Sequence, residues 1–276
     1  MLLGAGGMLH RAWDLLLSKR GVAHRNLRRA ELDLARSESI ETAIPADCRL
    51  VINCAAFTDV DAAEQQESVA TAVNGVGVGA LAEACARRNT TLVHYSTDYV
   101  FDGKGTRPYL PDDPRGPIGA YGRSKAVGEG LIERSGCRHL LIRTSWLYAP
   151  WGKNFVRTIA GFARQNKPLK IVADQRGRPT SSEHLAAASL ELIERGAHGT
   201  YHVTDGGGDC TWYEFALEIA RLVNPACSVK PITTAELGRP AQRPAYSVLD
   251  LHKTESLIGT MPRWHQNLAD VVSRIE

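Results

Sequence analysis

The sequence predicts an α/β fold, a doubly wound parallel sheet with a smaller C-terminal α/β lobe, and three observations support this prediction. A glycine-rich turn, Gly4-Ala5-Gly6-Gly7, directly follows an apolar run at the N-terminus. Short apolar runs then alternate with stretches of helical periodicity up to about residue 146, which is the pattern of βα units in a parallel sheet. The length of 276 residues suits one such domain with an annex.

The overall composition narrows the class of protein. A hydrophobic content of 43% and a charged content of 23% are ordinary for a globular chain. We find no signal peptide and no apolar run close to the ~20 residues that span a bilayer, so we expect a cytoplasmic protein with no membrane partner. A net charge of +3 is too small to indicate a nucleic-acid partner. The six cysteines form no C-x-x-C pair, as in a reduced enzyme, and a homodimer remains open.

The first βα unit is predicted from the glycine-rich turn. Residues 1–3 are short for a central strand, so we expect either that the natural chain starts further upstream or that this strand is frayed. The turn leads into a helix over residues 8–20, whose N-terminus would face a pyrophosphate. Gly21 is a suitable stop for this helix.

The second strand, over residues 22–27, bears on the choice of cofactor. Its end is where dinucleotide-binding folds place an acid for the ribose 2′-hydroxyl or a cation for a 2′-phosphate. Arg28 and Arg29 stand there, and no acid appears before Glu31. The alternative is a solvated basic turn. We therefore expect NADPH, with NADH as the second choice.

The later elements follow from the same periodicities. Strands are predicted over 50–56, 91–97 and 140–144, a helix over 62–88, and the loop 57–61 at the carboxyl edge of the sheet, where ligands bind. Helix 181–195 and strand 200–203 are expected to rejoin the main sheet. Residues 1–146 with about 181–204 would thus form the dinucleotide-binding domain. Residues of about 147–180 and 205–276 would form the substrate-binding lobe.

Tyr121 and Lys125 are the pair that carries chemistry. On a helix they lie four residues apart on one face. A free phenol, with a pKa of about 10, is a poor acid or base at neutral pH, and a nearby cation brings that pKa toward the working range. A solvated surface pair is the alternative, because Y-x-x-x-K alone is a weak signal. Ser96 and Thr97, which end a predicted strand upstream, strengthen the catalytic interpretation.

This order of motifs resembles the short-chain dehydrogenase/reductase superfamily, which implies a Rossmann-type fold. Longer stretches resemble the dTDP-4-dehydrorhamnose reductase family over nearly the whole chain. They are His94–Gly103, Tyr121–Lys125, Arg143–Tyr148, Asp174–Thr180 and the region from Arg243 to Leu249. The resemblance implies reduction of the 4-keto group of a dTDP-linked 6-deoxyhexose by NAD(P)H, in deoxysugar biosynthesis. It leaves the product sugar and the C4 stereochemistry undetermined.

The resemblance also implies roles for individual residues. Tyr121 would protonate the C4 oxygen, Lys125 would hold the nicotinamide ribose and tune Tyr121, and Thr97 would hydrogen-bond the carbonyl oxygen. The expected cofactor-binding residues, besides Tyr121 and Lys125, are Gly4, Gly6, Gly7, Met8, Leu9, Arg28, Asp33, Leu34, Cys54, Ala55, Ala56 and Asn74. The expected substrate-binding residues, besides Thr97, are Thr58, Val60, Asp98, Tyr99, Trp146 and Arg243; Trp146 as plain core and Arg243 as a solvated loop residue are the alternatives.

The chain departs from the family pattern at two points. His10 stands where the third glycine of G-x-x-G-x-x-G is usual, and we expect it to push the helix from strand one at a packing cost. An imidazole directed at the phosphates is the alternative. Some relatives bridge dimers with Mg²⁺ held by glutamates; Glu183 matches one such position but Ala12 falls on another, so we expect no structural metal.

Three other functions were weighed. Nucleotide-sugar dehydratases need a Glu after Thr-Asp, and Tyr99 takes that position here. A nucleotide-sugar 4-epimerase is harder to exclude from motifs, although the Trp146 and Asp174–Thr180 segments favour the reductase. A non-catalytic NADP-binding regulatory subunit, resembling that of methionine adenosyltransferase, also stays open, since an intact catalytic set argues against it without excluding it.

Overall fold

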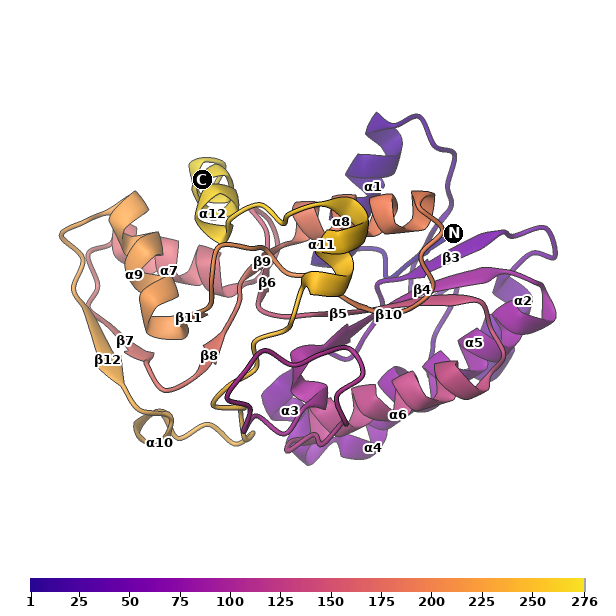
Figure 1. Ribbon diagram of the computed structural model, residues 1–276, viewed down its shortest axis with the longest axis horizontal. Helices are drawn as coiled ribbons and strands as arrows, with labels where there is room; N and C mark the ends of the chain where they lie inside the picture. The colour runs from indigo at the N-terminus through magenta and orange to yellow at the C-terminus, as the bar shows by residue number, and fades with distance from the viewer. Residues whose placement is uncertain (276) are drawn as a thin grey trace.

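The chain folds around a six-stranded parallel sheet, seen in a computed structural model that describes residues 1–275 (Figure 1). Neighbouring strands pair in parallel throughout. In spatial order they are β2 (Asn26–Leu27), β1 (Leu2–Leu3), β3 (Leu50–Asn53), β4 (Thr91–Thr97), β5 (His139–Thr144) and β10 (Gly199–His202).

The strand order reverses at β1. The chain goes from β1 to β2 on one side and returns to β3 on the other, so the carboxyl ends of β1 and β3 flank a crevice. In open parallel sheets such a switch point is where ligands bind. The α/β fold class with a parallel central sheet is therefore confirmed.

Helices cover both faces of the sheet (Figure 1). One face packs against α1 (Met8–Lys19) and α8 (Ser182–Glu194), with Trp13 fully buried between helix and sheet. The other packs against α2 (Ser37–Ala43), α5 (Gly77–Arg87) and α6 (Ala120–Arg134). Two separate apolar cores result, and each excludes water from one side of the strands.

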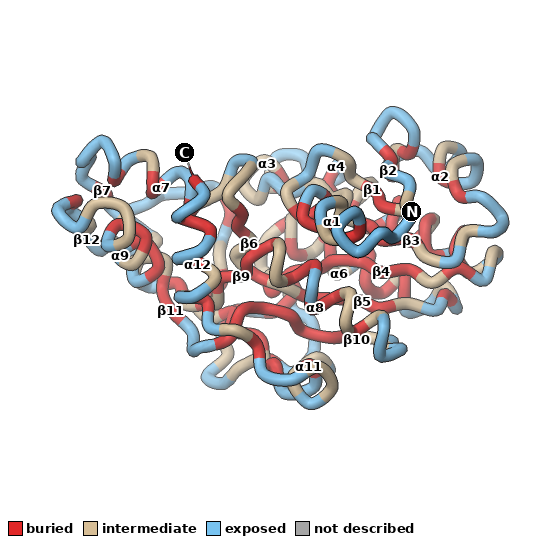
Figure 2. The backbone as a smooth tube through the Cα atoms, turned by 90° about the horizontal axis from the view of Figure 1, so that it is seen from above, coloured by how far each residue is buried: buried red, intermediate tan, exposed pale blue. Residues whose placement is uncertain are grey.

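The second lobe has its own apolar core. Its centre is Phe215 of α9 (Trp212–Val223), which is fully buried. Figure 1 shows this lobe beside the sheet, and Figure 2 shows the buried backbone running through both parts. Its remaining elements are β6 (Leu147–Tyr148), α7 (Phe155–Arg164), β7 (Leu169–Val172), β8 (Arg176–Gly177), β9 (Thr180–Ser181), β11 (Cys210–Thr211), β12 (Val229–Ile232), α10 (Thr234–Leu237) and α12 (Trp264–Ser273). Helix α11 (His252–Ile258) packs back against α8 and β10.

The predicted helix over 62–88 is not continuous. It consists of α3 (Val60–Gln65), α4 (Glu67–Thr71), a π-helical turn over Ala72–Val76, and α5. An inserted π turn rotates the apolar face, so Val69 and Val76, which one unbroken helix would place on its apolar face, are 46% and 60% exposed. The prediction was wrong because it counted one unbroken period of 3.6.

The stretch from Glu67 to Arg87 also corrects our statement about apolar runs. By length and composition it passes as a membrane span. More than half of it is buried inside the protein, against α6 and α2. Core helices pass the same test, and this stretch belongs to the core on one face of the sheet.

The N-terminal strand is short but fully paired. The Met1 ammonium donates to Leu50 O at 2.7 Å, and Met1 O accepts from Ile52 N at 2.9 Å. The expectation of a frayed strand was therefore wrong, because even two residues share their backbone groups with β3.

Candidate active site

One cleft of about 800 Å³ opens at the carboxyl ends of the strands, between the sheet and the second lobe. It gathers residues from β1, β3, β4, α6 and the start of the lobe. Predicted site residues that line it are Gly4, Gly6, Gly7, Met8, Leu9, Asp33, Leu34, Cys54, Ala55, Ala56, Thr58, Val60, Thr97, Asp98, Tyr99, Tyr121, Lys125 and Trp146.

The glycine-rich turn forms one end of the cleft. Gly4 has a φ of +88°, and a Cβ on it would stand 2.8 Å from Ala55 N. Only glycine allows this approach between the turn and the end of β3. Helix α1 begins at Met8 with no acid in its first turn, so its N-terminal amides favour an anion.

The cation at this end is Arg29 rather than Arg28. Arg29 lines the cleft, and its Nε lies 3.2 Å from Asp33 Oδ2. Arg28 lies outside the cleft lining, and its backbone amide donates to Glu31 Oε2. Sequence analysis named both arginines but placed only Arg28 among the cofactor-binding residues, whereas Arg29 is the one that faces the cavity.

His10 does not point at the pyrophosphate mouth, and its predicted effect on the position of the helix stays a prediction. It is buried on α1, outside the cleft lining. Burial lowers its pKa, while Asp14 and Asn26 act to raise it, and its Nε2 has no hydrogen-bond partner among the described residues. The side chain is thus accommodated beside β2, among polar neighbours, rather than at the pyrophosphate mouth.

Tyr121, Thr97 and Asp98 meet at the centre of the cleft. Thr97 Oγ1 donates to Asp98 Oδ1 at 2.9 Å. A Cβ on Gly122 would stand 2.1 Å from Tyr99 O, so glycine lets α6 press directly against the end of β4. Burial raises the pKa of Tyr121, the charge of Asp98 adds to this, and a hydrogen bond with Thr97 opposes it. The phenol thus holds its proton, which suits a proton donor.

Asp98 is an unusual acid. It is 2% exposed, and its Oδ2 has no hydrogen-bond partner among the described residues. Burial raises its pKa to about 7, although Ser247 and Thr97 act to lower it. A carboxyl group in this state is poised between its two protonation forms near neutral pH.

The spacing on α6 suggests Tyr121 as the partner of Lys125, but Lys125 hydrogen-bonds other groups. Its Nζ lies 2.6 Å from Tyr95 O and 3.1 Å from His94 Nε2, at 2% exposure. Burial lowers its pKa to about 8, and Glu129 opposes this shift. Our expectation that Lys125 brings the pKa of Tyr121 toward neutrality is not met, because burial dominates the pKa of both side chains.

Aromatic rings form the far wall of the cleft. Trp146 stacks on Trp212 with ring centroids 3.7 Å apart, and both line the cavity. Trp146 has a φ of +47°, a strained conformation for a bulky residue. Such a flat apolar surface suits the face of a sugar ring.

Two further predicted residues lie outside the cleft lining. Asn74 is buried in the π-helical turn, where it hydrogen-bonds both backbone groups of Phe57 and Ser124 Oγ. Arg243 binds both carboxylate oxygens of Asp61 at 3.0 Å. Asn74 therefore holds the loop before α3, and Arg243 ties the C-terminal loop to that helix.

Sequence reasoning missed several cleft residues. Lys153 and Asn154 come from the turn before α7, and Trp212 opens α9, so all three belong to the second lobe. The G-K-N run after a predicted strand was a usable signal for the first two. Trp212 gave none, because a tryptophan on an amphipathic helix is usually core. The other unpredicted lining residues are Ala5, Leu32, Phe57, Val73, Tyr95, Ser96, Thr144, Ser145, Leu147 and Gly152.

The expected absence of a structural metal stays a prediction. Glu183 forms an ion pair with Arg274. Among residues 1–275, no group of three or more His, Cys, Asp or Glu side chains is arranged to hold a metal ion.

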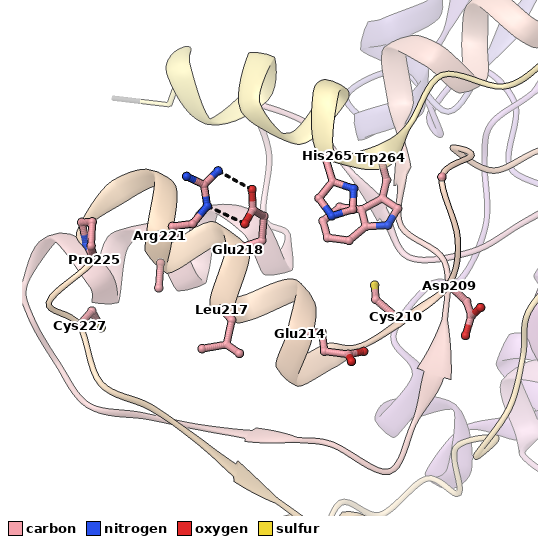
Figure 3. Close-up of a pocket in the computed structure, with 12 residues that line it drawn as sticks. Asp209, Cys210, Glu214, Leu217, Glu218, Arg221, Pro225, Cys227, Trp264 and His265 are labelled. Atoms are coloured by element: carbon pink, nitrogen blue, oxygen red, sulfur yellow. Dashed lines mark hydrogen bonds and ion pairs between the residues drawn. The ribbon is translucent and has the colours of Figure 1, made fainter.

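A second hollow, of about 610 Å³, lies outside the cleft between α9 and α12 (Figure 3). Its acids are already paired with protein groups. Glu218 accepts two hydrogen bonds from Arg221, Glu214 accepts from Thr211 N, and Asp209 accepts from Arg176. Because these charges are satisfied, the cleft is the better candidate site.

Comparisons with known proteins agree with this geometry. The family described as RmlD substrate binding domain matches residues 1–276. A dTDP-4-dehydrorhamnose reductase of Streptomyces griseus is 41% identical over 260 residues, which cover 91% of this chain and 84% of the relative.

Solved structures agree as well. A dTDP-4-dehydrorhamnose reductase of Clostridium acetobutylicum superposes with a TM-score of 0.93 at 36% identity, covering 99% of this chain and 97% of that one. The enzyme of Bacillus anthracis, solved in complex with NADP, gives 0.92 at 33% identity, covering 98% and 96%. A UDP-glucose 4-epimerase of Thermus thermophilus gives 0.84 at 20% identity, covering 99% and 97%, which shows the fold alone. The chain belongs to the dTDP-4-dehydrorhamnose reductase family.

Proposed function

We propose that this protein is an oxidoreductase that uses NADPH to reduce the 4-keto group of a dTDP-4-keto-6-deoxyhexose. The observation that carries the proposal is the single cleft that joins the glycine-rich turn to Thr97, Tyr121 and Lys125. Family membership supports the substrate class, because relatives across the family are named as reductases of dTDP-linked keto sugars.

The residues present fit a dinucleotide. The close approach of Gly4 to Ala55 leaves room for a pyrophosphate at the start of α1. Arg29 is suited to a 2′-phosphate at the end of β2. The cofactor, when bound, supplies the hydride. The small side chains of Cys54, Ala55 and Ala56 let it lie against β3.

The protein supplies positioning and a proton. Tyr121 protonates the C4 oxygen, and Thr97 orients the carbonyl by a hydrogen bond. Lys125 would hold the nicotinamide ribose. Trp146 and Trp212 form an apolar wall for the sugar, next to Thr58, Val60 and Tyr99. Arg243 would have to exchange Asp61 for the diphosphate of the substrate in order to bind it.

Cofactor binding and substrate binding are divided between the sheet domain and the second lobe. Residues 1–146 with about 181–204 form the cofactor-binding domain, and about 147–180 with 205–276 form the substrate lobe. The location of β10 beside β5 and of α8 on the sheet supports this division. On this proposal the chain acts in the cytoplasm on a small nucleotide sugar, without nucleic acid or membrane.

Tyr121→Phe tests the proposed activity. The variant should lose about 10²–10⁴-fold in kcat and keep its NADPH affinity, because only the proton is removed. The assay follows loss of reduced nicotinamide with a dTDP-4-keto-6-deoxyhexose, and product NMR assigns the C4 configuration. Binding of NADPH without turnover in the parent would favour the regulatory subunit instead. Interconversion of C4 epimers without net cofactor use would favour the epimerase.

Arg29→Ala and Arg28→Ala form a matched pair that tests cofactor choice. Loss of an exposed charge-assisted contact is worth about 1.5 kcal/mol or somewhat more, so Arg29→Ala should raise KM for NADPH about tenfold and leave KM for NADH unchanged. Arg28→Ala should change neither constant. Equal losses for both cofactors in Arg29→Ala would remove Arg29 from 2′-phosphate recognition.

A further inference from the structure

A buried chain of hydrogen bonds runs from β3 to Lys125. Ala55 N donates to Asn53 Oδ1 at 3.0 Å, and Asn53 Nδ2 lies 3.0 Å from His94 Nδ1. His94 Nε2 in turn lies 3.1 Å from Lys125 Nζ. Asn53, His94 and Lys125 are each at most 2% exposed. Water therefore does not relieve a mismatch of donors and acceptors along this chain.

The amide of Asn53 fixes the tautomer of His94. Because Ala55 N donates to Oδ1, the Nδ2 group, which is only a donor, faces the imidazole. His94 Nδ1 must then be the acceptor. Burial, and next the charge of Lys125, lower the pKa of His94 well below its ordinary value, so the ring is neutral and its proton sits on Nε2.

This tautomer presents an N–H group to Lys125. An ammonium has three donors and no acceptor, whereas a neutral amine has a lone pair. A donor facing an ammonium inside the protein is unfavourable, and a donor facing an amine is a hydrogen bond. We propose that Asn53 and His94 are positioning residues that favour the neutral amine of Lys125 over its ammonium in the cofactor-free protein.

The other charges around Lys125 leave this effect in place. Glu129, one turn further along α6, favours the ammonium. Its carboxylate, however, is bound by Arg143 of β5 and by Arg115. On the cleft side, Tyr121 keeps its proton, and Asp98 titrates near neutrality and acts on Tyr121. No unpaired carboxylate thus hydrogen-bonds Lys125 in the part of the chain that the structure describes.

The consequence for catalysis rests on the proposed function. Lys125 must carry a proton to hold the ribose and support Tyr121, so kcat/KM, which reports the free enzyme, should fall above the pKa of Lys125. Asn53 and His94 keep this alkaline limit low. If Asn53 and His94 merely supported the fold, substituting them would change the free energy of unfolding and leave the alkaline limit of kcat/KM unchanged.

Asn53→Asp is the decisive variant. The new carboxylate keeps the acceptor for Ala55 N and replaces the donor by an acceptor, so His94 must move its proton to Nδ1. Nε2 then accepts from the Lys125 ammonium. The pKa of Lys125, followed by ¹³Cε NMR in lysine-labelled protein, should rise by roughly one unit or more. The alkaline limb of kcat/KM should move with it.

The His94 tautomer is read directly by ¹⁵N NMR in cofactor-free protein, with His94→Gln used to assign its signal. The proposal expects Nε2–H in the parent and Nδ1–H in Asn53→Asp. Nδ1–H in the parent overturns it, and this readout needs neither activity nor a folded variant. If Asn53→Asp raises the pKa of Lys125 but leaves the His94 tautomer unchanged, the new carboxylate acts by simple attraction on the ammonium. That result also overturns the proposal. Failure of the activity assay alone would count against the proposed function instead.

Discussion

Helix α6 buries two charged residues one turn apart, and the protein treats them in opposite ways. Glu129 accepts two hydrogen bonds from Arg143, at 2.9 and 2.7 Å, and a third from Arg115 at 3.1 Å. Burial alone would raise the pKa of Glu129, but these guanidinium groups lower it below its ordinary value. Lys125 meets only a backbone carbonyl and a neutral imidazole.

The difference separates a structural charge from a chemical one. A buried charge with complete ionic partners is held in one protonation state. A buried charge with neutral partners changes state near neutral pH, which is what proton chemistry requires. Asp98 belongs with Lys125 in this respect. The active site thus places its unpaired charges next to the cleft and its paired charge one turn further away.

The largest effect should come from breaking the paired charge. Glu129→Gln leaves the Arg143 guanidinium buried without its anion, so the free energy of unfolding should fall by about 3–5 kcal/mol. Urea denaturation measures this change. A loss below about 1 kcal/mol would show that the ion pairs of Glu129 contribute little to stability, and the contrast with Lys125 would then fail.

Asp98→Asn should act next most strongly, and its effect should depend on pH. Because the pKa of Asp98 is raised to about 7 from an ordinary value of 3.8, its contribution is fully present below about pH 4 and is lost as the pH rises through 7. Asn does not titrate. The unfolding free energy of the parent, relative to the variant, should therefore fall by up to about 4 kcal/mol between pH 4 and 8. A constant difference over this range would show that Asp98 is ionised throughout.

Lys125→Met should have a smaller effect of the opposite sign to Glu129→Gln. The pKa of Lys125 is lowered to about 8 from 10.5, so its ammonium costs folding free energy below pH 8, and stability rises as the pH goes from 8 to 10.5. The variant should gain about 1–3 kcal/mol at pH 7, lose this gain by pH 10.5, and lose activity throughout. A destabilised variant at pH 7 would place Lys125 with the paired charges.

The smallest effect should come from an exposed pair. Arg123, also on α6, makes two hydrogen bonds with Glu67, at 2.7 and 2.9 Å, but both side chains are about two-fifths exposed. Arg123→Ala should cost less than about 1 kcal/mol, and the cost should shrink further in high salt. A cost equal to that of Glu129→Gln would mean that burial does not determine how much an ion pair contributes to stability.

The elements that sequence analysis predicted well are those set by local periodicity. Strand β4 has the predicted bounds, helix α8 lies within one residue of its predicted ends, and most predicted site residues line the cleft. The failures have a common cause. The π-helical turn, the exchange of Arg29 for Arg28 and the partners of Lys125 all depend on which side chains meet across elements. His94 and Glu129, which were not among the predicted site residues, act on the protonation state of Lys125, and no spacing along one helix reveals that.

The spacing of Tyr121, Lys125 and Glu129 along α6 places all three side chains on one stripe of the helix. Each residue of an α-helix turns by about 100°, so positions four apart stay on one stripe. One residue inserted between Tyr121 and Lys125 would rotate both buried charges away from their partners at once, whereas a substitution disturbs only one. A change in the length of α6 should therefore be far more harmful than an exchange of one residue. The loop over residues 103–119 before it runs outside the regular elements, so we expect a change of length to be tolerated there.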